Sequence, residues 1–375
     1  MAVMHGLFAG LTTVDVVHLL DHIPDVTTKT TSRAHLLAAG GPATNAALTF
    51  AALERIRVRP DVDEGVERSV GQVDTGVELL TATGRGPAHE LVRSELADLG
   101  VEVLDATDTA DGSAAVDTAI SSVVEHPGGR FVASTNARVP LDAALATRLL
   151  REAVDRRGPL DVVLVDGHNP VLADLALRLG TATGVDAGTK GEAPSSERGR
   201  EAETGPFGPG DPFAELSDVP SHLRVLDGGS WKPWMVPLLG LVDVAVVSAD
   251  FVPPLVAEAR DAPSLVAEFL RGFGIARVVC TDGANPVHWW WGAHHGSVEV
   301  GGVDAVSTMG AGDVFHGAFA WALADAHARG ETVDDPGALI GFASAVAGIS
   351  TTTFGTRAWI GDPRLAGHVG AVRVP

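Results

Sequence analysis

A run of small residues directly before an acid is the part of this sequence best suited to chemistry. Residues 307–319 read STMGAGDVFHGAF, so Gly310, Ala311 and Gly312 precede Asp313. Small residues let a backbone turn bring several N–H groups close to a ligand oxygen, and a helix N-terminus adds roughly half a positive elementary charge. A helix beginning at Asp313 would make this stretch an anion cradle beside a carboxylate. Such an arrangement suits phosphoryl transfer, although a glycine-rich turn with Asp313 as a plain N-cap would read the same.

Two further segments suit a ligand with several hydroxyl groups. Residues 38–53 read AAGGPATNAALTFAAL, with Gly40 and Gly41 at a turn and Asn45 on the opening turn of a helix. Paired glycines allow close approach of a ligand, and an Asn amide can donate to and accept from neighbouring hydroxyls. Near the start, GLTTVD ends in Asp15, whose carboxylate can accept two hydroxyl hydrogen bonds, unless it is an ordinary Asp in a turn.

Alternating strand and helix patterns must position these residues. Short, near-continuous apolar runs followed by helices of about 10 to 16 residues favour parallel strands with helical crossovers, and so a doubly wound α/β sheet flanked by helices. The predicted strands are 3–10, 77–83, 160–167, 223–229, 242–249 and 276–283. The predicted helices are 41–53, 87–99, 141–156, 170–179, 264–273, 313–328 and 337–350. Polar residues at the strand ends, such as Asp166 and Asp227, would line a crevice.

Several segments interrupt this alternation. Residues 55–75 read as an insertion, and residues 181–222, rich in Gly, Pro, Glu and Ser, read as a mobile loop. Residues 26–39 and 112–135 read as antiparallel strands with a PGG turn, which we expect to form a small sheet over the crevice. The run HWWWGAHH favours a hairpin with turn GAHHG over a metal site, because adjacent strand residues point to alternate faces.

Composition excludes several classes of protein. The 375 residues carry a formal net charge of −21, which argues against nucleic acid or an anionic membrane as the main partner. Cys280 is the only cysteine, so no intramolecular disulfide can form. No segment reaches about 18 unbroken apolar residues, and the N-terminus lacks a basic region followed by a long apolar run. We therefore expect a cytoplasmic location.

Residues 307–319 resemble the second signature of the ribokinase family, the PfkB-type carbohydrate kinases, and residues 38–53 resemble its first signature. The resemblance implies one ribokinase-like kinase domain over residues 1–375 with a small β-sheet lid, and the use of ATP and Mg²⁺. It also implies that Asp313 is the general base and that the backbone of Gly310, Ala311 and Gly312 stabilises the transferring phosphoryl group. Ser307 replaces an Asp found in many members, and activation by a monovalent cation stays open.

The resemblance carries over further site residues, each of which has an ordinary structural alternative. The acceptor site would hold Asp15, Gly40, Gly41, Asn45, His168 and Lys232. The nucleotide site would hold Thr281, Gly283, Ser344 and Gly355, and Asp250 would help to order the metal. Lys232 could equally be a solvated surface lysine, and His168 a structural histidine.

The resemblance therefore predicts an enzyme, an ATP-dependent carbohydrate kinase that phosphorylates a hydroxyl of a small sugar or sugar derivative. The alternatives are an adenosine-like nucleoside kinase and a non-catalytic, sugar-binding member of the family. A homodimer formed through the lid is compatible with either activity.

Overall fold

A nine-stranded sheet forms the centre of the protein in the computed structural model, which describes residues 2–25, 27–58, 74–108, 117–135, 139–179, 222–259 and 263–372. The strand order is β13-β12-β11-β10-β9-β8-β1-β4-β5, and neighbours run parallel except on either side of β12. The strands are β1 (Gly6–Ala9), β4 (Val77–Thr81), β5 (Val101–Asp105), β8 (Val162–Val165), β9 (Leu223–Gly228), β10 (Val244–Ser248), β11 (Arg277–Thr281), β12 (Val287–Trp291) and β13 (His294–Val298).

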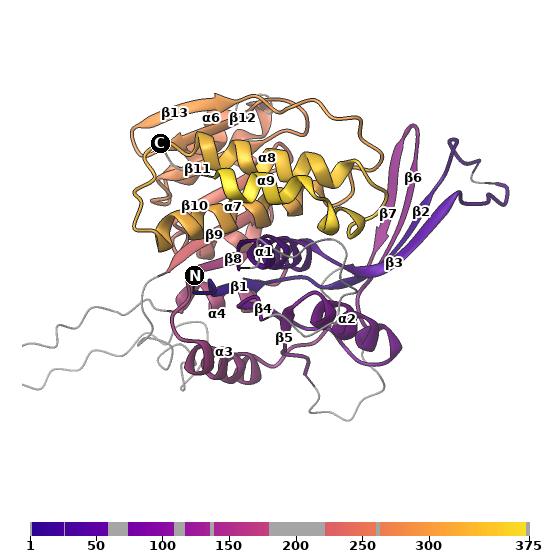
Figure 1. Cartoon of the computed structure of the whole chain (residues 1–375), viewed down its shortest axis with the longest axis horizontal. Helices are drawn as coiled ribbons and strands as arrows, with labels where there is room; N and C mark the ends of the chain where they lie inside the picture. Colours follow the sequence, from indigo (N-terminus) through magenta and orange to yellow (C-terminus); the bar gives the residue numbers. More distant parts are fainter. Residues whose placement is uncertain are drawn as a thin grey trace, which may run out of the picture.

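Helices cover both faces of this sheet (Figure 1). One face packs against α1 (Pro42–Val58), α7 (Ala311–Ala328), α8 (Gly337–Thr351) and α9 (Arg364–Ala371). The other face packs against α3 (Ala143–Arg157), α4 (Pro170–Arg178), α5 (Val236–Leu239) and α6 (Pro263–Arg271). The remaining elements are α2 (Pro87–Asp98) and the short 3₁₀ segments η1 (Pro233–Met235), η2 (Pro254–Ala259) and η3 (Ala358–Gly361). Central strands such as β8 are buried on both faces, which explains their unbroken apolar sequence.

The topological switch point of the sheet lies between β1 and β8, because the chain proceeds outward from them in opposite directions. A ligand crevice in such a sheet opens at the carboxyl ends of these strands. There the buried carboxylate of Asp166, directly after β8, accepts backbone N–H groups of Leu11 (2.8 Å), Ala43 (3.2 Å) and His168 (2.8 Å). One side chain thus joins the ends of β1 and β8 to the first turn of α1.

A second, four-stranded sheet projects from the body of the protein (Figure 1). Its order is β3-β2-β6-β7, with an antiparallel β2–β3 pair, a parallel β2–β6 pair and an antiparallel β6–β7 pair. The strands are β2 (Thr13–Leu19), β3 (Ala34–Gly40), β6 (Ile120–His126) and β7 (Gly129–Ser134). We call this sheet the lid.

The lid differs from the sequence prediction in its central strand. Residues 26–39 and 112–135 do not pair with each other, because β2 lies between them. β2 escaped prediction since Asp15 and His18 interrupt its apolar residues.

Other boundaries also shift. The predicted turn GAHHG is wrong: the turn of the β12–β13 hairpin is Gly292–Ala293, and His294 already belongs to β13. The alternation expected for the tryptophans is confirmed, since Trp289 and Trp291 are buried on one face while Trp290 packs against the cluster on the other. α1 continues to Val58, so the predicted insertion 55–75 begins inside a helix; residues 59–73 and 180–221 lie outside the described residues.

Close packing of α1 against α7 is the contact between helices that sets the geometry of the crevice. A Cβ added to Gly317 would lie 2.4 Å from the Ala46 carbonyl oxygen and 2.8 Å from Thr49 Cβ, so only glycine permits this approach. One turn further along, the fully buried Glu54 accepts hydrogen bonds from Trp321 Nε1 (3.1 Å) and Met4 N (2.9 Å). Glu54 therefore ties α1 to α7. No helix in the described part of the chain is both long and apolar enough to cross a membrane.

We expect Gly317→Ala to lower the free energy of unfolding by about 1–3 kcal/mol, because the new methyl group must push the two helices apart. Gly341→Ala in α8 is the matched control: nothing lies within 4 Å of its added Cβ, so the change should stabilise by about 0.5–1 kcal/mol. Urea denaturation followed by circular dichroism measures both. Equal effects of the two substitutions would contradict the close packing at Gly317.

Candidate active site

The first turn of α7 forms an anion cradle. Gly310 precedes the helix in the left-handed conformation (φ 72°), and no side chain caps the helix. Ala311 N donates to Thr308 O and Val314 N donates to Gly310 O, whereas the N–H groups of Gly312 and Asp313 point beyond the helix end, where no helical acceptor exists. A Cβ added to Gly312 would meet nothing within 4 Å, so the approach to these groups is open.

Asp313 lies inside this turn. α7 begins at Ala311, two residues earlier than predicted, so Asp313 is the third helical residue and the N-cap alternative is wrong. Its Oδ2 accepts a hydrogen bond of 2.7 Å from Asn45 Nδ2 across the α1–α7 contact. Burial, together with the negative charge of Asp227, raises the pKa of Asp313 to about 7, although Asn45 and His316 oppose the rise. A half-buried carboxyl with this pKa can exchange a proton near neutral pH.

Asp15 lies close to Asp313, and its charge contributes to the raised pKa there. It is the third residue of β2, so it is not the ordinary Asp in a turn of the alternative interpretation. Thr13 Oγ1 donates a hydrogen bond of 2.6 Å to Asp15 Oδ1. Burial raises the pKa of Asp15, although the hydrogen bond from Thr13 acts to lower it. The predicted glycine pair makes room: a Cβ on Gly40 would lie 2.0 Å from Asp15 Oδ2, and one on Gly41 (φ +101°) would lie 2.2 Å from Leu11 O.

The four predicted residues Asp15, Gly40, Gly41 and Asn45 therefore gather around Asp313. Two more residues were missed by sequence reasoning. Arg357, in the loop between α8 and η3, donates from Nη1 to Asn45 Oδ1 (3.1 Å) and from Nε to Glu95 Oε1 of α2 (2.6 Å). No local pattern indicates these residues, because 312 positions separate Arg357 from Asn45.

A second polar group surrounds the end of β9. Asp227 is buried there, with Oδ2 at 3.4 Å from His316 Nδ1, and His316 Nε2 faces Val246 O at 3.1 Å. Burial and the nearby Asp166 raise the pKa of Asp227 well above its usual range, while burial lowers the pKa of His316. Burial thus disfavours the charged form of both residues.

The predicted residues His168 and Lys232 flank this group. Both are half-buried, and burial lowers the pKa of each. The charges of Asp166 and Asp227 act in the opposite direction on Lys232. Lys232 is therefore not the freely solvated lysine of the alternative interpretation.

Ser307 connects the cradle to the lid. Its hydroxyl lies 3.0 Å and 2.8 Å from the two carboxylate oxygens of Glu125 on β6, and both residues are buried. An Asp at position 307 would set two carboxylates against each other. The departure from the family signature is thus matched by a carboxylate supplied from the lid.

The residues predicted for the nucleotide lie at the end of β11, on α8 and in the loop after α8. Thr281 ends β11, where its hydroxyl faces Val247 O (3.4 Å), and Gly283 (φ +56°) follows with open space around its Cα. Ser344 on α8 has a buried hydroxyl without a partner in the described part of the chain. Gly355 (φ +85°) packs against Leu36 of the lid instead of standing free, since an added Cβ would lie 2.6 Å from Leu36 Cδ2.

Asp250 is exposed in the turn after β10, where its N–H faces Ser248 Oγ at 3.2 Å. Within the described ranges, no group of three or more His, Cys, Asp or Glu residues gathers to hold a metal ion. This arrangement fits Mg²⁺ only if a nucleotide supplies most of its ligands, which is the usual manner of Mg²⁺ binding in kinases.

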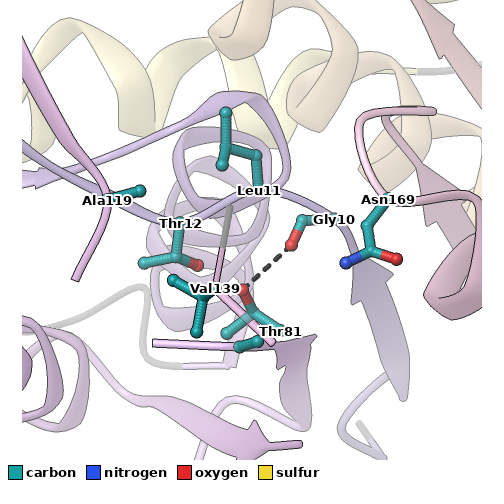
Figure 2. Close-up of a pocket in the computed structure, with 8 residues that line it drawn as sticks. Gly10, Leu11, Thr12, Thr81, Ala119, Val139 and Asn169 are labelled. Atoms are coloured by element: carbon teal, nitrogen blue, oxygen red, sulfur yellow. Dashed lines mark hydrogen bonds between the residues drawn. The ribbon is translucent and has the colours of Figure 1, made fainter. Parts of the chain in front are cut away.

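Two cavities in the described part of the chain lie away from Asp15 and Asp313, and neither of these residues lines them. One cavity, of about 10 Å³, lies beside the switch point. This volume has room for about one water molecule. Figure 2 shows residues that line it and the hydrogen bond that Thr81 Oγ1 donates to Gly10 O, which is 2.9 Å long. A larger cavity of about 460 Å³ lies at the opposite, amino ends of β10 and β11, next to Arg277 and Trp291, and none of the predicted site residues lines it.

We expect Asp313→Asn to raise the unfolding temperature at pH 8 and to raise it much less at pH 5. The folded-state pKa of about 7 exceeds the ordinary value of 3.8, so the folded protein holds this proton more tightly than the unfolded chain. Stability is therefore lost as the pH rises from about 4 to about 7, by an amount on the order of 4 kcal/mol at most. Asparagine removes this cost. Thermal unfolding at both pH values provides the measurement, and an equal difference at pH 5 and pH 8 would rule out the raised pKa.

Comparison with known proteins bears on the fold and the family resemblance. The sequence pattern of the family described as pfkB family carbohydrate kinase matches residues 230–361. No curated protein sequence matches the chain. Ribokinase from Thermotoga maritima is similar in structure, with a TM-score of 0.63 and 17% identity over 98% of this chain and 99% of that one.

Ribokinase from Giardia lamblia gives a TM-score of 0.66 with 14% identity over 97% and 98% of the two chains. Ribokinase from Arabidopsis thaliana, solved in complex with ribose and ATP, gives 0.61 with 14% identity over 98% and 99%. The resemblance predicted from the sequence is thereby confirmed: residues 230–361 match the pfkB family of carbohydrate kinases, and the whole chain shares the fold of solved ribokinases.

Proposed function

We propose that this protein is an ATP-dependent kinase that phosphorylates a hydroxyl group of a small sugar or sugar derivative. The observation that carries the proposal is the carboxyl of Asp313, which lies in the first turn of α7 beside open backbone N–H groups and has a pKa near 7. A proton acceptor next to an anion cradle is what transfer of a phosphoryl group to an alcohol requires. The ATP and ribose bound to the Arabidopsis enzyme of the same fold support this choice of substrates.

The acceptor would lie between Asp15, Asn45 and the glycine pair. Asp15 Oδ1 is engaged by Thr13, which leaves Oδ2 as the oxygen able to accept a substrate hydroxyl. Gly40 and Gly41 keep the backbone close to both side chains without obstruction. His168 and Lys232 lie further along the crevice, where they would contact the distal part of the sugar. Two carboxylates and an amide facing one space favour a ligand with several hydroxyl groups over a mainly apolar one.

Transfer would proceed by displacement at the γ-phosphorus of ATP. The acceptor hydroxyl gives its proton to Asp313 as its oxygen forms a bond to phosphorus, and the bond from phosphorus to the bridging oxygen breaks to release ADP. The backbone N–H groups of Gly312 and Asp313, with the positive end of α7, would stabilise the charge on the moving phosphoryl group. Gly310 and Ala311 shape the turn that presents them.

Thr281, Gly283, Ser344 and Gly355 are proposed to border the nucleotide. Asp250 would face the metal through water molecules, since it is exposed and belongs to no group of three or more His, Cys, Asp or Glu residues in the described part of the chain. When bound, Mg²⁺ would neutralise phosphate charge and orient the γ-phosphoryl group. Ser307 already hydrogen-bonds with Glu125, so our proposal includes no monovalent cation.

The lid is proposed to pair with the lid of a second copy of the chain. Strand β7 is an exposed edge along its whole length, and Phe131 and Val132 are 63% and 49% exposed. An exposed apolar edge strand favours association.

We expect Phe131→Asp to shift the protein from dimer to monomer. A charge on an apolar contact must be buried without a partner, which weakens association. Sedimentation velocity over a range of protein concentrations measures the change, with Leu255→Asp, at an 85% exposed apolar residue outside the lid, as the control for one added negative charge. A wild-type protein that stays monomeric at high concentration would end this proposal.

The central test is turnover. Purified protein, ATP and Mg²⁺ should release ADP with at least one member of a panel of sugars, and less with nucleosides. Asp313→Asn should lose about 10²-fold or more of kcat while it keeps ATP binding, because it removes only the proton acceptor. In the wild type, kcat/KM should fall about tenfold per pH unit below an apparent pKa near 7.

The other outcomes separate the alternatives. Turnover only with nucleosides would make the protein a nucleoside kinase. Sugar binding by calorimetry without any ADP release would make it a non-catalytic binding protein. Full activity of Asp313→Asn would remove the general base from the proposal.

A further inference from the structure

We infer that Arg357, held by Glu95, is a positioning residue that keeps the amide of Asn45 turned with its NH₂ group toward Asp313. This inference rests on the proposed role of Asp313 as the general base. It assigns a part in the reaction to two charged residues that neither sequence motif contains.

The argument starts from the two ends of the Asn45 side chain. A primary amide can present either its oxygen or its NH₂ group in one direction, and only the NH₂ group stabilises a carboxylate. Asn45 Nδ2 lies 2.7 Å from Asp313 Oδ2, and Asn45 Oδ1 accepts from Arg357 Nη1 at 3.1 Å. Because a guanidinium is only a donor, the amide oxygen must face Arg357. Rotation of the amide by half a turn would place donor against donor and oxygen against oxygen.

Arg357 is itself fixed by the protein. Nε donates to Glu95 Oε1 at 2.6 Å, Nη1 also donates to Thr356 O at 2.9 Å, and Nη2 donates to Ala39 O. Four of its five N–H groups therefore have protein acceptors. A guanidinium with so little donor capacity left does not suit a substrate anion, but it is well suited to orient a neighbour.

Glu95 completes the arrangement. Its second oxygen, Oε2, accepts Ala39 N at 2.7 Å, so one carboxylate binds both the guanidinium and the backbone of β3. The side chains of Arg357 and Glu95 are only 16% and 20% exposed, which strengthens their attraction relative to a surface pair. Segments from α1, α2, β3 and the loop after α8 thus meet at one guanidinium.

The charges around Asp313 explain why this orientation matters. Asp227 and Asp15 raise the pKa of Asp313, and burial raises it further. The hydrogen bond from Asn45 and the proximity of His316 are the contacts that lower it. Without a fixed amide, the base would hold its proton more tightly and be less often free to accept one at neutral pH.

The test compares Arg357→Gln with Arg364→Gln. Arg364 is a matched control on the same C-terminal segment, since it is half-exposed and its side chain bonds, among the described residues, to Asp362 and Thr352 and to no residue of the site. We expect Arg357→Gln to move the acid limb of the kcat profile to higher pH, with a loss of roughly tenfold at pH 7 that shrinks by pH 9. The control should keep the wild-type profile. Glu95→Gln should act in the same direction and serves if Arg357→Gln does not fold.

A double substitution separates positioning from general stability. If Arg357 acts through Asn45, adding Arg357→Gln to Asn45→Ala should move the acid limb no further. A full additional shift in the Asn45→Ala background would overturn the inference, as would an unchanged pH profile in the single variant with kcat and KM altered equally.

The inference can fail separately from the proposed function. If the wild-type protein turns over no acceptor, the carboxyl carbon of Asp313 can still be titrated by carbon-13 NMR, with Asp313→Asn to assign the signal. The proton affinity of Asp313 should then be roughly three- to tenfold higher in Arg357→Gln than in the wild type. An equal affinity in both proteins would sink the inference whatever the enzyme does.

Discussion

The hydrogen bond between Asn45 and Asp313 is the contact on which the rest of the site depends. It joins the first turns of two helices that are 268 residues apart in sequence, and it exists only because Gly317 lets α1 and α7 approach closely. The same approach places the anion cradle of α7 opposite the glycine pair that precedes α1. Glu54 and Trp321 tie the two helices together further along, where the contact is entirely buried.

The crevice concentrates carboxyl groups, which would repel one another if all were ionised. Each therefore has a different environment. Asp166 accepts hydrogen bonds from three backbone N–H groups. Asp227 faces His316, and its pKa is raised well above the usual range. Glu95 forms an ion pair with Arg357. Asp313 is left with one amide donor and a pKa near neutrality. The different proton affinities of these similar side chains follow from their partners, and they fit the proposed role of Asp313 as the carboxyl that exchanges protons.

Local patterns predicted most of the fold and the centre of the site. Buried parallel strands and long helices have strong periodic signals, and Gly310 to Asp313, Asp15 and Asn45 lie in motifs with an evident physical purpose. The lid strand β2 was not predicted, because Asp15 and His18 interrupt the run of apolar residues in its sequence. Arg357, Glu95 and Glu125 were missed because each acts on a residue far away in the chain, so only the folded packing brings the partners together.

Only Gly41 separates strand β3 from helix α1. The edge strand of the lid and Asn45, which hydrogen-bonds with Asp313, therefore lie on one continuous stretch of backbone. Arg357 donates hydrogen bonds to residues on both sides of Gly41, namely to the carbonyl oxygen of Ala39 and to the side-chain oxygen of Asn45. A tilt of the lid would therefore displace the amide of Asn45, whose hydrogen bond lowers the pKa of Asp313. In the proposed function, enclosure of a ligand and the proton affinity of Asp313 are therefore linked through the six peptide units from Ala39 to Asn45.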